Sequence, residues 1–177
     1  MYDETDVHEA TATDYLQHAR EVNSIAGASL RLESRNATAI AAKISIGLSL
    51  QAVELAGKAI MRALGHSVED IRREHRRHDL LTLLRQAQAE LQEWQGDRLD
   101  PYRRFLLHTP TIDGRPMGNT IADYLEEHFS QGASALPRSY FYPDESVFTG
   151  PEPIQAIHVM AQHIIEVAEN VVGILTE

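Results

Sequence analysis

Apolar residues recur at the three- and four-residue spacing of a helix in four long stretches of the chain. The first stretch follows Thr11 or Thr13, either of which can cap a helix, and carries Tyr15, Ala19, Val22 and Ala26. The second covers roughly residues 37–64 and starts at Asn36 or Thr38, after a break at 34–36. It is apolar over most of its circumference and leaves a narrow polar stripe of Lys43, Gln51, Glu54, Lys58 and Arg62. Because such a helix is surrounded by others, we expect it at the centre of the fold.

The third and fourth stretches predict two further long helices. Asp79 can cap the third, whose apolar stripe is Leu80, Leu84, Ala87, Leu91 and Trp94, with Gly96 closing it. The fourth begins near Pro151 or Pro153, where a missing N–H costs little. Its stripe is Ile154, Ile157, Ala161, Ile164, Ile165, Ala168, Val171, Val172 and Leu175.

Shorter signals mark the connections. Gly65 is expected to end the central helix, and "SVED", with Ser67 and Asp70 three residues apart, has the form of a capping box. Residues 97–137 form an irregular insertion that includes a turn in "DGRPMGN" and a short helix, "NTIADYLEEHF", begun by Asn119. No strand alternation is recognised. The sequence therefore predicts a solvated tail at 1–10 and one domain at 11–177. Its fold class is all-α, an antiparallel up-and-down bundle of four main helices plus minor helices.

Composition and charge argue against several classes of site and partner for this chain. The chain has 177 residues and no cysteine, which excludes disulfides and thiolate zinc sites. Its start is acidic and polar, unlike a signal peptide, and no uninterrupted apolar run reaches the roughly 18–20 residues that span a bilayer. We therefore expect a cytoplasmic protein without membrane contact. The net charge of −10 disfavours nucleic-acid binding over the whole surface. However, "RREHRRHDLLTLL", from Arg72 to Leu84, gathers four arginines and two histidines before a leucine run.

Three segments, in this order, resemble the HEPN family of small helical-bundle proteins. They are "SLQAVELAGKAIMRALG" (Ser49 to Gly65), "RHDLLTLL" (Arg77 to Leu84) and "RSYFYPDESVFTGPEPIQAIHVMAQHIIEVAENVV" (Arg138 to Val172). The last is similar to the family's Arg-Tyr-Pro-Asp element followed by a C-terminal helix. In this chain that element is stretched between Arg138 and Asp144, and Glu54 is separated from Lys58 where the family often has an adjacent pair.

The resemblance implies a dimer that binds RNA or a nucleotide, and in many members a metal-independent endoribonuclease. Others partner a nucleotidyltransferase in toxin–antitoxin pairs. The family's catalytic signature, an arginine followed by four to six residues and a histidine, fits Arg73 and His78, with His78 moving protons and Arg73 holding phosphate. The implied anion- or nucleotide-binding residues are Arg72, Arg76, Arg77, Asp79, Arg138 and Tyr142.

Other interpretations of the same residues stay open. Arginine and histidine at this spacing also arise by chance in a chain with 9 histidines, and Arg72 with His78 and Arg103 with His108 match as well. The basic cluster can be a solvated turn whose arginines pair with Glu69, Asp70 and Glu74. Alternatively, the basic side chains at the start of the third helix attract an anion. The whole protein can also be a catalytically silent dimeric module that docks an acidic protein. No cofactor motif is recognised, and His75 with His78 lacks a third metal ligand.

Overall fold

The protein is all-α in a computed structural model that describes residues 9–29, 35–74, 80–112, 114–129 and 152–177. Its α-helices are α1 (Ala12–Ser29), α2 (Arg35–Ala63), α3 (Val68–Glu74), α4 (Leu80–Glu93), α5 (Ile121–Phe129) and α7 (Glu152–Thr176). Two 3₁₀ helices, η1 (Asp97–Tyr102) and η2 (Phe105–Leu107), follow α4. The short strands β1 (Thr111–Ile112) and β2 (Arg115–Pro116) form an antiparallel hairpin.

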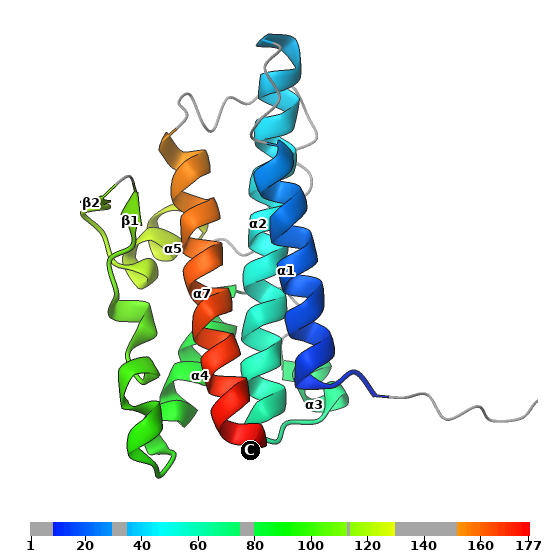
Figure 1. Cartoon of the computed structure of the whole chain (residues 1–177), viewed down its shortest axis with the longest axis vertical. Coiled ribbons are helices and arrows are strands. Elements are labelled where there is room, and N and C mark those ends of the chain that lie inside the picture. The colour runs from blue at the N-terminus through cyan, green and yellow to red at the C-terminus, as the bar shows by residue number, and fades with distance from the viewer. Residues whose placement is uncertain (1–8, 30–34, 75–79, 113, 130–151) are drawn as a thin grey trace, which may run out of the picture.

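The long helices α1, α2 and α7 lie side by side, and α1 runs in the opposite direction to the other two (Figure 1). α4 packs against α2, while η1 and β1 pack against α7. The all-α class expected from the periodicity is confirmed. The finer expectation, an up-and-down bundle of four main helices, stays a prediction.

The prediction that α2 is the central helix is confirmed, because it contacts α1, α3, α4 and α7. Its buried side chains belong to one hydrophobic cluster with those of α1, α4, α5 and α7, and among them Val53, Ala56 and Ile60 are fully inaccessible to solvent. On the predicted polar stripe, Glu54 and Lys58 form an ion pair at 2.5 Å, and both side chains are partly buried. Ile44 departs from the expected pattern, since 45 % of it is exposed.

Local capping explains where several helices start. The Thr11 hydroxyl accepts the Asp14 N–H at 3.2 Å, and Asp14 accepts the Thr11 N–H at 2.8 Å, so Thr11 rather than Thr13 caps α1. The last two residues of the predicted tail are attached to the fold, because the Ala10 carbonyl accepts a hydrogen bond from Arg62 at 3.0 Å.

Several expected boundaries were wrong. α2 begins at Arg35, before both predicted caps, and α5 is capped by Thr120 instead of Asn119, since the Thr120 hydroxyl accepts the Asp123 N–H at 3.2 Å. Trp94 lies beyond the end of α4 and is 42 % exposed. Gly96 starts η1 and does not close α4.

The insertion was predicted without strands, yet it contains the β1–β2 hairpin, whose second strand lies within the stretch expected to be a turn. Gly114, which precedes that strand, is in the left-handed region at a φ of 77°. Two-residue strands are too short to show alternation in the sequence, which explains why the hairpin was missed.

One described helical segment, Ile44–Ala63 of α2, is long and apolar enough to cross a membrane when judged by length and composition alone. Its most apolar window is 61 % buried among the other helices. This is what the core helix of a helical bundle is expected to show.

Candidate anion-binding site

The connection between α2 and α3, directly before the basic cluster, is held by several hydrogen bonds. α2 ends in a Schellman motif: the Gly65 N–H donates to the Arg62 carbonyl at 3.1 Å, and the His66 N–H donates to the Met61 carbonyl at 3.1 Å. Gly65 has a φ of 103°, which favours glycine. The prediction that Gly65 ends this helix is therefore confirmed.

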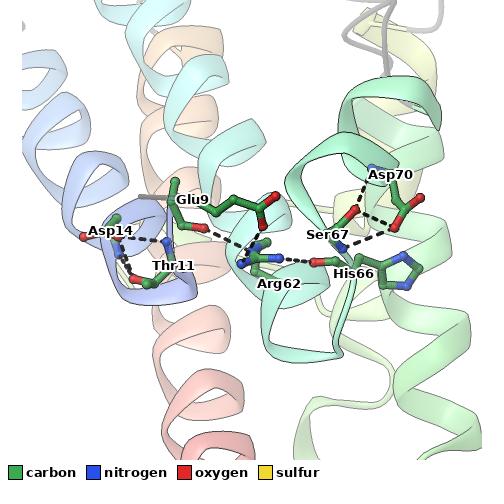
Figure 2. A network of polar contacts seen from close by, with 8 residues as sticks. Glu9, Thr11, Asp14, Arg62, His66, Ser67 and Asp70 are labelled. Carbon is green, nitrogen blue, oxygen red and sulfur yellow. Dashed lines mark hydrogen bonds and ion pairs between the residues drawn. The ribbon is translucent and has the colours of Figure 1, made fainter. Parts of the chain in front are cut away.

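The predicted capping box at the start of α3 is also confirmed (Figure 2). The Ser67 hydroxyl donates to the Asp70 carboxylate at 2.6 Å and accepts the Asp70 N–H at 3.0 Å. The hydrogen bond from the Ser67 hydroxyl is the main cause that lowers the pKa of Asp70 below its usual value, with Arg73 and His66 adding to it. Asp70 is thus held in its charged form by the same contacts that begin the helix.

The side chains of Arg62 and His66 make further contacts that hold the connection between α2 and α3 in place. Arg62 lies between the two ends of this network (Figure 2): it donates to the His66 carbonyl at 2.5 Å and lies 3.6 Å from the Glu9 carboxylate. The His66 ring contacts the Glu90 carboxylate of α4 at 2.7 Å. The contacts of Arg62 with Glu9 and of His66 with Glu90 were not predicted, because these partners are far apart in the chain.

Arg72 and Arg73 lie on α3, after the capping box, and both are exposed. Ile71, only 2 % exposed, anchors the helix to the core. Arg73 forms an ion pair with Asp70 at 2.9 Å, and its side chain is still 61 % exposed. Arg72 is exposed and makes no hydrogen bond or ion pair with any other residue in the described part of the chain. The pairing of Arg73 fits the interpretation as a solvated turn, whereas Arg72 remains available to a ligand.

Most of the other predicted site residues lie outside the described residues, namely Arg76, Arg77, His78, Asp79, Arg138 and Tyr142. Of the proposed catalytic pair, the structure therefore describes Arg73 but not His78. By chain order, residues 75–79 connect α3 to α4, and α4 begins at Leu80, directly after the predicted cap. We call residues 72–79 the α3–α4 corner.

The Arg103–His108 match does not form one site, because the two side chains contact different partners. The Arg103 guanidinium donates to the carbonyls of Trp94 at 2.8 Å and Gly96 at 3.1 Å, and it pairs with Asp100. It thus holds the chain that leaves α4. The His108 ring instead lies against His163 of α7, with Nδ1 and Nε2 3.1 Å apart.

This histidine contact was not predicted, because 55 positions separate the two residues. Burial is the main cause that lowers the pKa of the His163 imidazole, followed by its neighbour His108, while Glu166 acts in the opposite direction. Among the described residues, no group of three histidine, cysteine, aspartate or glutamate side chains is arranged to hold a metal ion.

Comparison of the chain with models of protein families, with curated proteins and with solved structures finds no match.

Proposed function

We propose that the protein binds a phosphate-bearing ligand, a nucleotide or single-stranded RNA, at the α3–α4 corner. The observation that supports this most is the exposed Arg72 side chain, which has no partner in the described part of the chain and projects from a helix fixed at its start. A guanidinium group in this position can donate two parallel hydrogen bonds to a phosphate.

The local charge balance predicts how this binding responds to pH. Residues 69–79 contain four arginines and four acidic residues, together with His75 and His78. One of the acids, Asp70, is already occupied by the α3 cap and by Arg73. Histidine gains positive charge between about pH 8 and pH 5, so an anion should bind more tightly at pH 6.0 than at pH 7.5.

A direct test measures the fluorescence anisotropy of a labelled single-stranded RNA in EDTA. The corner variant Arg72→Ala/Arg77→Ala removes two guanidinium groups that charge-assisted hydrogen bonds would use, and we expect its affinity to fall by about tenfold or more. The matched control is Arg104→Ala/Arg115→Ala. It changes the net charge equally, and in the described part of the chain neither arginine has an ion-pair partner. Equal weakening by both variants would show that binding follows overall charge and is not located at the corner.

The same RNA tests the catalytic part of the proposal, in which Arg73 holds a phosphate and His78 transfers protons. We expect cleavage that persists in EDTA and is lost in His78→Gln, while the affinity for a non-cleavable 2′-deoxy substrate is retained. Binding without cleavage at any protein concentration would reduce the function to nucleotide or RNA binding.

A second candidate is a catalytically silent dimeric module, favoured by two exposed apolar side chains on the α1–α2 pair. Ile25 is 56 % exposed and Ile44 is 45 % exposed. If a second copy covers them, light scattering should give twice the 19.8 kDa mass of the chain, and Ile25→Glu/Ile44→Glu should return it to one chain. Leu107→Glu is the matched control, since Leu107 is also 56 % exposed and lies on η2. In this function the basic corner would dock an acidic protein or a nucleotidyltransferase partner, and RNA would not bind.

A further inference from the structure

A pair of histidines links the hairpin region to the last helix. His108 directly follows η2, and its Nδ1 lies 3.1 Å from Nε2 of His163 in α7. The ring centroids are 5.2 Å apart and the planes are tilted by 56°. At this distance one neutral imidazole donates a hydrogen bond and the other accepts it.

The chain around His108 is anchored on one side and exposed on the other. Its carbonyl accepts the Ile121 N–H at 3.0 Å, and Ile121 is fully buried at the start of α5. Phe105 in the preceding turn is fully buried as well. Between these anchors lie the described residues of the hairpin region, 108–112 and 114–117, in which both residues of β2 are exposed and β1 packs against α7 (Figure 1). The hairpin is thus held to the bundle by apolar contacts of Pro110, Ile112 and Met117 and, at its start, by the polar contact between the two histidines.

The charges around the pair oppose double protonation. His108 acts against a positive charge on His163, and Glu166, one turn further along α7, acts in its favour. On the elements packed against α7, three basic side chains form ion pairs: Arg20 of α1 with Glu169, Arg98 of η1 with Glu177, and Lys58 of α2 with Glu54. β1 carries no charged residue, and Arg115 of β2 adds a further positive charge to the hairpin.

We propose that His108 and His163 form a pH-sensitive latch, which holds residues 108–117 against α7 at neutral pH and releases them when both rings become protonated. One shared proton keeps the contact as a charge-assisted hydrogen bond, whereas a second proton leaves two donors, two positive charges and no acceptor. Release therefore follows the second protonation of the pair, which the positive charge already present makes less favourable than the first. The buried side chains of η2 and α5 keep the rest of the fold in place.

Hydrogen exchange followed by mass spectrometry tests the latch in the full chain, with exchange expressed as protection factors so that the intrinsic pH dependence is removed. Between pH 7.5 and pH 5.0 we expect protection of the amides in 108–117 to fall by about two- to tenfold, as the loss of one hydrogen bond implies. Amides of α2 should change little.

Two variants make the result specific. His163→Gln keeps a hydrogen-bonding side chain that cannot become charged, so the pH response of 108–117 should disappear. His18→Gln is the matched control on the exposed surface of α1 and should respond as the wild type does. The latch is refuted if wild-type protection in 108–117 is the same at both pH values, if His163→Gln responds as the wild type does, or if α2 loses protection to the same extent.

Discussion

The close approach of α2 and α4 at Gly57 makes a sharp prediction about stability. A Cβ atom at this position would lie 2.9 Å from Cδ2 of Leu83 and 3.2 Å from Cδ2 of Leu84. Leu83 is 1 % exposed and Leu84 is fully buried, so both side chains lie within the hydrophobic core. Glycine at this position therefore allows the two helices to pack closely.

Gly47 offers a matched control in the same helix, because a Cβ added there has no neighbour within 4 Å. Replacing a helical glycine with alanine stabilises a helix by about 0.8–1 kcal/mol, which Gly47→Ala should deliver in full. At Gly57 the same gain is opposed by about 1–3 kcal/mol of overpacking. We therefore expect Gly57→Ala to be neutral or destabilised by up to about 2 kcal/mol, so that the two variants differ by about 1–3 kcal/mol.

Urea unfolding measured by circular dichroism would determine both free energies of unfolding. For a domain of this size, each kcal/mol also corresponds to about 2–4 °C in Tm. A double variant adds a check on the cause: Leu83→Val should cost less in the Gly57→Ala background than alone, because it removes an atom from the crowded contact. If Gly57→Ala stabilises the protein as much as Gly47→Ala does, the inferred packing of α2 on α4 is wrong.

Two further predictions concern single contacts. The lowered pKa of Asp70 implies that the stabilising contribution of its carboxylate is present above the ordinary value of 3.8 and is lost as the pH falls through the lowered folded-state pKa. In urea unfolding, the difference in stability between Asp70→Asn and the wild type should therefore be smaller at pH 3 than at pH 6. Arg103→Ala should destabilise the protein by about 1–3 kcal/mol, because the carbonyls of Trp94 and Gly96 lose their donor, whereas thermal unfolding of the exposed Arg104→Ala should match the wild type. An Arg103→Ala variant as stable as the wild type would mean that these hydrogen bonds contribute nothing.

The features that the sequence predicted well are those determined within one or two turns of a helix. The capping box of Ser67 with Asp70 could be recognised because both partners lie three residues apart. The centre of the fold could be recognised because α2 is apolar on nearly every side. Trp94 was misplaced because the apolar spacing continues one residue past Glu93, where the helix ends, and the spacing alone does not mark that end.

Features that depend on distant pairs could not be found in this way. The His66 contact with Glu90 joins residues 24 positions apart, and the His108 contact with His163 joins residues 55 positions apart. Helical periodicity carries no signal for such pairs, because it reports which face of one helix is buried and not which residue of another helix meets it. The residues of the candidate site were predicted from composition and resemblance, and Arg72 and Arg73 alone among them lie in the described part of the chain.

Comparing two capping boxes shows whether the rigid start of α3, and not only the charge of its arginines, contributes to binding at the α3–α4 corner. Ser67→Ala removes the cap of α3, and Thr120→Ala removes the equivalent cap of α5. Each substitution should cost about 0.5–2 kcal/mol of stability without changing a charge. If the exposed arginines bind an anion because α3 holds them in position, loosening its start adds an ordering cost to binding, and Ser67→Ala should weaken RNA affinity several-fold. Thr120→Ala should leave it unchanged. If both variants bind RNA as the wild type does while both lose stability, then flexible arginines suffice and the corner is a charge cluster without a preorganised site.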